Sequence, residues 1–186
     1  MEGLLRFDLE SFKAINIGLH KDWLDPIFTV ITYTGLGITC TIGALLLLVW
    51  RSTRAYVAPL LLALAIGGWG LADGIKPIVG RERPSNLPFA LPQEPLRLSS
   101  FPSGHTADAF SMAFMLLFLT WGTPRAKWGW LALVWAALVG FSRVYRGVHW
   151  PSDVLAGAMC GLVAACIASL IWARIGDRFN PKASFS

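Results

Sequence analysis

Long apolar segments, separated by short polar ones, are the feature that most limits what this 186-residue chain can fold into. A helix that crosses a bilayer needs about 20 mostly apolar residues. Five stretches reach or approach that length: Pro26–Trp50, Ala55–Ile75, Gly104–Trp121, Lys127–Phe141 with an extension to about Tyr145, and Ser152–Ala173. The pattern predicts an all-α integral membrane protein, a bundle of five to six transmembrane helices in one domain that spans residues 1–186.

The composition favours a bilayer over water. Hydrophobic residues make up 55% of the chain and charged residues only 15%, whereas a soluble domain carries about 25% charged residues. Tryptophans also gather near the predicted span ends, where interfacial anchors are expected. These are Trp23, Trp50, Trp121, Trp128, Trp150 and Trp172.

The first 22 residues have a different pattern. Apolar residues recur at spacings of three and four, with charged residues between them, and the apolar set is Leu5, Leu9, Phe12, Ile15 and Leu19. Such a stripe suits a helix lying on a membrane surface. The segment lacks the basic start and the continuous apolar core of a signal peptide. We therefore expect residues 1–22 to form a retained, interfacial amphipathic helix.

The net charge of +5 does not indicate a nucleic-acid partner, because the basic residues form neither a stripe nor a tail. The three cysteines, Cys40, Cys160 and Cys166, lie inside apolar runs without a C-x-x-C pair. Their number and spacing argue against a disulfide framework or a zinc site. We expect the bilayer to be a partner, and the sequence gives no indication of an oligomeric state.

A polar, proline-rich connection at residues 76–103 is predicted to be an active-site loop. If the helices alternate, it lies on the same side as the end of the fourth stretch and the start of the fifth. The opposite side carries Arg51, Arg54, Arg125, Lys127, Arg174, Arg178 and Lys182. The shared side carries Arg6, Lys13, Lys21, Arg81, Arg97 and Arg146. By this narrow margin, the positive-inside rule predicts that the shared side faces outward.

Three polar clusters fall on that shared side: Lys76–Pro84, Pro102–His105, and the segment that holds Arg143, His149 and Asp153. Ionisable groups at membrane depth are costly and tend to mark function. Three converging cations, Lys76, Arg83 and Arg143, repel one another unless an anion joins them. Phosphate suits them because the arginine fork matches its oxygens, and the helix that begins after Pro102 offers free N–H groups.

Two histidines lie in this predicted anion pocket, and His20 lies in the N-terminal segment. His149 and Asp153 are four residues apart, so the carboxylate can hold one imidazole nitrogen and leave the other unprotonated for attack. His105 could give a proton to the leaving oxygen. Taken singly, a histidine near a helix end, a Pro-Ser-Gly turn or an arginine at a span end is usually structural. Their coincidence on one side favours a site.

A catalytic metal fits this cluster poorly, because three neighbouring cations oppose a divalent ion and no third good ligand is present. We therefore expect neither a metal nor a cofactor. Ser103 is a possible nucleophile, but it lacks the Gly-x-Ser-x-Gly elbow.

The chain resembles the type-2 phosphatidic acid phosphatase superfamily, which includes vanadium haloperoxidases and bacterial acid phosphatases. The family pattern is Lys, six residues, Arg-Pro; then Pro-Ser-Gly-His; then Ser-Arg, five residues, His, three residues, Asp. It matches from Lys76 to Asp153 without a departure. Membrane members often have six spans, whereas five apolar stretches and an amphipathic segment are present here.

The resemblance implies a role for each matching residue. His149 would be the nucleophile that forms a phosphohistidine, Asp153 would orient it, and His105 would protonate the leaving group. The phosphate oxygens would be held by Lys76, Arg83, Ser103, Gly104 and Arg143. The resemblance requires no metal.

The resemblance gives the reaction class, and the substrate is expected to be a membrane lipid phosphate. An outward-facing site favours undecaprenyl pyrophosphate, since the short chain looks like the bacterial lipid-carrier phosphatases of the inner membrane. Phosphatidylglycerophosphate, phosphatidate and lipid A 1-phosphate are alternatives. A phosphotransferase, a lipid-binding protein and a transporter also remain open, although the His-His-Asp set and the lack of an inverted repeat argue against the last two.

Overall fold

A computed structural model describes residues 2–94 and 99–179, with backbone only over 176–179. All regular structure in these ranges is helical, without a strand, as the sequence predicts. The α-helices are α1 (Glu2–Phe12), α2 (Asp25–Thr34), α3 (Gly37–Leu46), α4 (Arg54–Leu64), α5 (Asp73–Val79), α6 (Gly104–Thr120), α7 (Ala126–Tyr145) and α8 (Pro151–Phe179). Two π-helical segments, Lys13–Gly18 and Ala65–Ala72, continue α1 and join α4 to α5, and short 3₁₀ turns cover Asp22–Leu24 and Pro84–Asn86.

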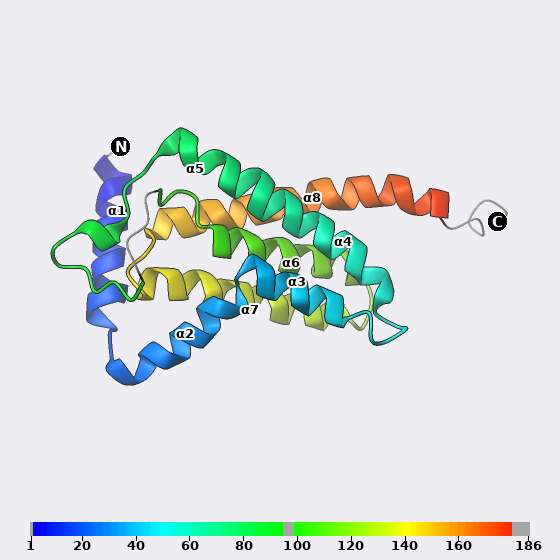
Figure 1. The fold of residues 1–186 in the computed structure, drawn as a ribbon, viewed down its shortest axis with the longest axis horizontal. Coiled ribbons are helices and arrows are strands. Elements are labelled where there is room, and N and C mark those ends of the chain that lie inside the picture. The colour runs from blue at the N-terminus through cyan, green and yellow to red at the C-terminus, as the bar shows by residue number, and fades with distance from the viewer. Residues whose placement is uncertain (1, 95–98, 180–186) are drawn as a thin grey trace.

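Helix α6 is the centre of the bundle and packs against α7, α8 and α4 (Figure 1). Small residues line these contacts, so the backbones approach closely, as is usual between helices in membranes. A Cβ atom at Gly129 on α7 would lie 2.5 Å from Leu117 Cα on α6. A Cβ atom at Gly161 on α8 would lie 2.7 Å from the Ser111 nitrogen. The two glycines therefore set how closely α7 and α8 approach α6.

The predicted count of five to six spans is not fully confirmed. Within the described residues, three helical stretches are long and apolar enough to cross a bilayer: Arg54–Val79, Ala126–Tyr145 and Pro151–Ile175. Helix α6 has the expected position, but its 17 residues give only about 25 Å of length. With the bent pair described next, the count rises to four.

The predicted span Pro26–Trp50 is not one helix. Helices α2 and α3 meet at a bend of 66°, which lies at Gly35 and Leu36. A Cβ atom at Gly35 would lie 2.3 Å from Val139 Cγ1, so glycine lets the end of α2 press against α7. The apolar run is continuous in the sequence, and hydropathy alone could not reveal this bend.

Two further boundaries differ. The second span runs to Val79 rather than Ile75, so Lys76 lies in α5 and not in the loop predicted at 76–103. Pro77 lacks the N–H that a helical residue donates, yet the helix continues for two residues beyond it, to Val79. The N-terminal helix is confirmed, although α1 and its π-helical extension end at Gly18 instead of residue 22.

Helix α1 lies across one end of the bundle, beside the start of α8 (Figure 1). Of the predicted apolar stripe, Leu5, Leu9 and Leu19 are exposed, but Phe12 is fully buried against Trp150. Asp8 and Asn16 are also fully buried. The helix therefore packs on the protein through a face that contains polar residues, which its hydropathy pattern did not indicate.

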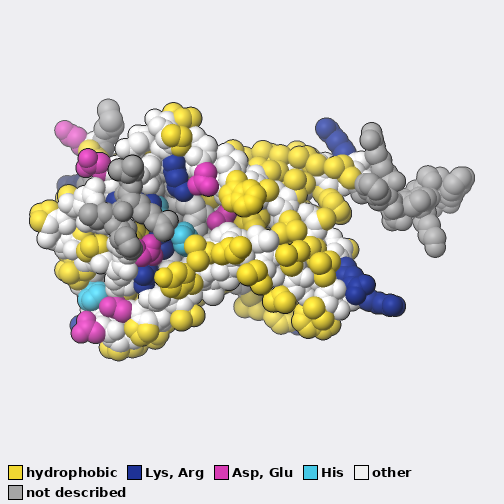
Figure 2. All heavy atoms as spheres, viewed as in Figure 1, with side chains coloured by type: hydrophobic (Ala, Val, Ile, Leu, Met, Phe, Trp, Pro, Cys, Tyr) yellow, Lys and Arg dark blue, Asp and Glu magenta, His cyan; other side chains and the backbone are white. Residues whose placement is uncertain are grey.

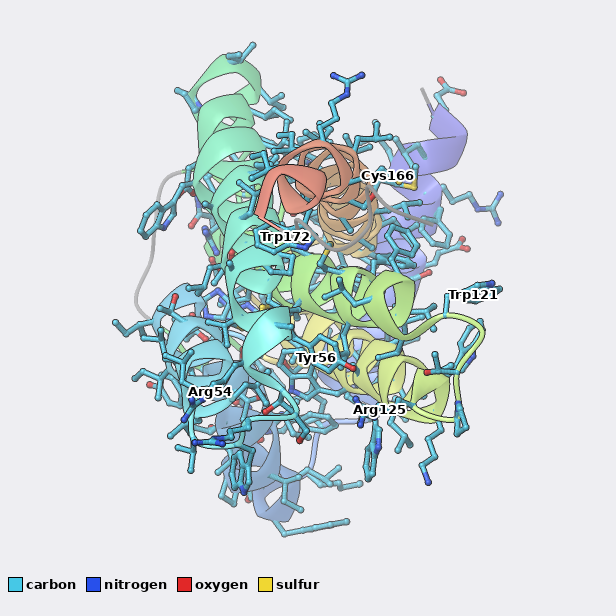
Figure 3. All side chains as sticks on the ribbon, turned by 90° about the vertical axis from the view of Figure 1, so that its right-hand side faces the viewer. Arg54, Tyr56, Trp121, Arg125, Cys166 and Trp172 are labelled. Atoms are coloured by element: carbon cyan, nitrogen blue, oxygen red, sulfur yellow. The ribbon has the colours of Figure 1, made fainter. Side chains whose placement is uncertain are left out.

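Polar side chains gather at this same end, whereas apolar side chains cover most of the rest of the visible face (Figure 2). The opposite end carries Arg54 and Trp121, and Arg125 Nη1 donates to the Tyr56 hydroxyl at 3.1 Å there (Figure 3). Lys182 lies outside the described residues, as does the Arg178 side chain. The fold thus brings the polar clusters of the sequence to one end of the bundle.

Candidate active site

His149 lies between α7 and α8 and is almost completely buried. Its Nδ1 atom is 3.5 Å from Asp153 Oδ2, and its Nε2 atom is 3.4 Å from Arg83 Nη1. Pro151 is the first residue of α8, the position where its missing N–H costs nothing. The two ring nitrogens of His149 thus have different neighbours, because Nδ1 faces the Asp153 carboxylate and Nε2 faces the Arg83 cation.

Asp153 is fully buried and has a complete set of hydrogen-bond donors. Arg81 Nη1 donates to its Oδ1 at 2.7 Å, and the Trp150 backbone N–H donates to its Oδ2 at 2.9 Å. The Ser100 hydroxyl also donates to Oδ2 and lies 3.4 Å from His149 Nδ1. A buried carboxylate needs such donors to remain ionised. The sequence motifs had indicated neither Arg81 nor Ser100 as part of the site.

The surroundings keep the His149 imidazole neutral. Burial, and after it the charges of Arg143 and Arg83, lower its pKa from 6.5 to about 4, against the opposing effect of Asp153. At neutral pH the ring therefore has an unprotonated nitrogen, as a nucleophile requires. Because Nδ1 faces the carboxylate, the lone pair belongs on Nε2, beside Arg83.

Arg83 and Arg143 are both buried and held at fixed points. Arg83 donates from Nη1 to the Val148 carbonyl at 2.9 Å and from Nη2 to the Ser99 carbonyl at 3.0 Å. Arg143 donates from Nη1 to Thr32 Oγ1 at 2.6 Å. These bonds tie Arg83 to the residue before His149 and to the segment before α6, and they tie Arg143 to α2.

Arg143 donates to a carboxylate that the sequence motifs did not indicate. Glu94 Oε1 is 2.6 Å from Arg143 Nη1, Glu94 Oε2 is 2.9 Å from Nη2, and Arg146 Nε is 3.2 Å from Oε1. Burial would raise the pKa of Glu94, but bonds and charge from Arg143 and then Arg146 lower it to about 2. The convergence of Lys76, Arg83 and Arg143 in the sequence pattern was the available signal that a carboxylate should lie nearby.

Lys76, Gly104 and His105 line a cavity of about 430 Å³ next to this cluster. Lys76 Nζ is 2.6 Å from Asp73 Oδ1. A Cβ atom at Gly104 would lie 3.1 Å from Lys76 Nζ, so glycine lets the start of α6 approach the lysine. Asp108 also lines the cavity.

Ser103 lies between the His149 cluster and the residues that line this cavity. Its backbone N–H donates to the Asp153 carbonyl at 3.0 Å, and its hydroxyl accepts from Thr106 Oγ1 at 2.8 Å. Because the N–H already has an acceptor, the hydroxyl is the group of Ser103 that can donate to an anion. The predicted residues fall into two adjoining sets: Arg83, Arg143, His149 and Asp153 in one, and Lys76, Gly104 and His105 in the other.

A group of three possible metal ligands among the described residues contains none of the predicted site residues. It comprises His20, Asp22 and Asp25. Asp25 Oδ1 already accepts from the Tyr145 hydroxyl at 3.0 Å and from Gln93 Nε2 at 2.7 Å. These bonds explain Asp25 as a structural anchor for the end of α7.

Comparison with known proteins gives a family and several relatives. A family model described as the PAP2 superfamily matches residues 56–177, which include every predicted site residue. The bacitracin transport permease protein BcrC of Bacillus licheniformis is 32% identical over 85% of this chain and 77% of its own length. An undecaprenyl-diphosphatase of Sulfolobus acidocaldarius is 32% identical over 83% of this chain and 73% of its own length.

The fold is also found in a solved structure. The crystal structure of the first transmembrane PAP2 type phosphatidylglycerolphosphate phosphatase, from Bacillus subtilis, matches with a TM-score of 0.79 and 28% identity. The match covers 94% of this chain and 89% of that one. The bundle with its N-terminal helix is therefore similar to a transmembrane phosphatase over nearly its whole length.

Proposed function

This chain belongs to the PAP2 superfamily and is a membrane lipid phosphatase, and we propose that it works through a phosphohistidine formed on His149. The observation that carries the proposal is the position of the buried, neutral His149, with Nδ1 toward Asp153 and Nε2 toward Arg83. The 3.5 Å separation of His149 from Asp153 is longer than a formed hydrogen bond. Such catalytic bonds often tighten only when substrate binds.

The proposed reaction has two steps. His149 Nε2 attacks phosphorus, the bond from phosphorus to the leaving oxygen breaks, and that oxygen takes a proton from His105. Water then attacks the phosphohistidine and gives a proton to His105. The N–P bond breaks, its electron pair returns to Nε2, and inorganic phosphate leaves.

The cations supply the stabilisation. As the phosphoryl group passes through its transition state, charge gathers on three equatorial oxygens, and preorganised donors favour that state. We assign this role to Lys76, Arg83 and Arg143, with the Ser103 hydroxyl and the Gly104 N–H at the start of α6. In this mechanism the side chains do the work of a metal, so neither a metal nor a cofactor is part of the proposal.

For the substrate we propose undecaprenyl pyrophosphate. A relative named undecaprenyl-diphosphatase supports this choice. So does the cavity beside Lys76 and His105, which adjoins an apolar cavity of about 250 Å³ lined by Leu61, Leu64 and Trp69. Two phosphates in series need more polar space than one, and an isoprenoid tail needs an apolar surface.

We further propose that the site faces the periplasm or the exterior of the bacterial inner membrane. The basic residues Arg54 and Arg125, at the opposite end of the bundle, support this orientation under the positive-inside rule. A protease-cleavable tag at the C-terminus should stay protected in intact cells. Cleavage of that tag before lysis would reverse the orientation.

The decisive test is phosphate release by the purified full-length protein, in EDTA, from a panel of lipid substrates. Undecaprenyl pyrophosphate should be preferred over phosphatidylglycerophosphate, phosphatidate and lipid A 1-phosphate. His149→Ala should remove activity, whereas Arg125→Ala, at the far end, should not. Activity that survives His149→Ala would exclude the nucleophile, and loss of activity in EDTA would point to a metal. A different preferred lipid would change only the substrate.

A further inference from the structure

Asp8 on α1 is a buried carboxylate that belongs to no motif of the family pattern, and it lies at the start of α8. Its Oδ1 accepts from the Ser152 backbone N–H at 2.9 Å, and its Oδ2 accepts from the Ser152 hydroxyl at 2.6 Å. These groups are 144 positions apart in the sequence. Because the side chain is only 1% exposed, these contacts are shielded from water and persist at ordinary salt concentrations.

The contact with Ser152 caps α8 from another part of the chain. The first N–H groups of a helix have no partner within it, and they carry the positive end of the helix dipole. Asp8 satisfies one of these groups with a full negative charge. Ser152 precedes Asp153 directly, so the cap fixes the turn that presents the Asp153 carboxylate.

A second path runs through Arg81. Its Nη2 donates to Asp8 Oδ2 at 2.6 Å, while its Nη1 donates to Asp153 Oδ1 at 2.7 Å and to the Ser152 hydroxyl at 2.6 Å. A guanidinium group is planar and rigid, so the two carboxylates on its two nitrogens are held in a fixed relation. Arg81 also lies over the Trp150 ring, with its Cζ 5.3 Å from the ring centroid.

We propose that Asp8 is a positioning residue of the active site, which acts on Asp153 through Arg81 and Ser152 and thereby sets the orientation and proton affinity of His149. The proposal rests on the proposed function of His149 as nucleophile. It makes α1, which lies across the site end of the bundle (Figure 1), part of the catalytic apparatus. Loss of the Asp8 charge leaves Arg81 to Asp153 alone, so the Asp153 carboxylate is drawn toward Arg81 and away from His149.

Replacing Asp8 also changes the charge near His149, and the direction of the resulting shift in pH dependence can be predicted. The charged groups that act on His149 are Asp153 on α8, Arg143 on α7 and Arg83 on the segment after α5, and Arg81 joins Asp153 to Asp8. Asp8→Asn removes one negative charge next to this set, at Arg81. Protonated His149 then becomes less favourable, so the acidic limb of kcat/KM, which requires neutral His149, moves to lower pH.

The experiment compares Asp8→Asn with Glu10→Gln in the full-length enzyme. Glu10 lies on the same helix, is exposed and pairs with Arg6. Asp8→Asn should lower kcat by about 10–100-fold, the range typical of outer hydrogen-bond partners in metal sites, with KM little changed and the acidic limb displaced. Glu10→Gln should behave as wild type. A raised KM with unchanged kcat, or a lowered kcat with an unmoved acidic limb, would overturn the proposal.

A milder variant keeps the test valid if Asp8→Asn does not fold. Ser152→Ala removes only the hydroxyl that Asp8 and Arg81 share, and it should give a smaller loss of kcat. Asp8→Asn combined with Arg81→Lys should lose less than the two single losses added together, because both residues act on Asp153. Additive losses, or a Ser152→Ala enzyme with wild-type kcat, would contradict the coupling. Activity in His149→Ala would instead show that the proposed function had failed, whatever Asp8 does.

Discussion

Glu94 holds Arg143 by two parallel contacts, 2.6 Å from Oε1 to Nη1 and 2.9 Å from Oε2 to Nη2. This is the geometry in which arginine binds a phosphate. Arg143 is one of the residues assigned to the substrate phosphate, so an arriving anion must share or displace the Glu94 carboxylate. We therefore expect Glu94 to compete with an anion for Arg143.

Glu94→Gln should accordingly strengthen inhibition by vanadate, which resembles the transition state. Removing one competing charge from a buried arginine pair is expected to lower the inhibition constant by about tenfold, equivalent to about 1.4 kcal/mol. Glu82→Gln is the matched control, because Glu82 lies on the segment after α5 with an exposed side chain. Weaker vanadate binding in Glu94→Gln would mean that Glu94 orients Arg143 and does not compete.

The pH dependence should reflect the buried imidazole. Burial and the nearby arginines lower the pKa of His149 from 6.5 to about 4, so kcat/KM should keep its His149-dependent activity down to about pH 4. The check is a pH–rate profile in detergent micelles, corrected for ionisation of the substrate. An acidic limb near pH 6.5 would contradict a desolvated His149.

The same shift affects folding. Below pH 6.5 the unfolded chain takes up a proton on His149 that the folded protein accepts only near pH 4. Stability should therefore fall as pH decreases across that window. Thermal unfolding of wild type and His149→Gln, compared at pH 7 and pH 5, should show the smaller loss in the variant.

Arg83 should not be replaceable by lysine. Its two nitrogens bind the Val148 and Ser99 carbonyls, which lie on different segments, while Nη1 also faces His149. A lysine ammonium cannot reproduce this planar fork. Arg83→Lys should lower kcat by about 10²–10³-fold, the usual loss for one transition-state donor. Arg125→Lys, at the opposite end, is the control, and near wild-type activity in Arg83→Lys would contradict the assigned role.

The sequence predicted those parts of the site that depend on local order. His149 and Asp153 are four positions apart at a helix start, and the Pro-Ser-Gly-His turn begins α6, so their neighbourhoods follow from short-range geometry. Alternation of the helices also predicts that the clusters share one end of the bundle. Both kinds of inference need only spacing and hydropathy.

The contacts that the sequence did not predict join distant segments. Asp8 is 144 positions from Ser152, and Glu94 is 49 positions from Arg143. No periodicity encodes such pairs, since either carboxylate could equally face water. The bend between α2 and α3 was missed for a related reason, because it lies where Gly35 packs closely against Val139 on another helix.

Close helix packing leads to a prediction about stability that is independent of the chemistry. Gly129→Ala should destabilise the protein by about 1–3 kcal/mol, the usual cost of overpacking. Its new methyl carbon would lie 2.5 Å from Leu117 Cα, a backbone atom that cannot move aside without displacing α6. Gly43→Ala is the matched control, because it is also helical but has no heavy atom within 4 Å of the added carbon.

The two variants should differ in the midpoint of thermal unfolding. Alanine is favoured over glycine in a helix by about 0.5–1 kcal/mol, and only Gly129→Ala sets a steric clash against that gain. Unfolding in the same detergent should therefore show a lower midpoint for Gly129→Ala and an unchanged or higher one for Gly43→Ala. Equal midpoints would mean that α6 and α7 are farther apart in the membrane protein than the contact of Gly129 with Leu117 requires.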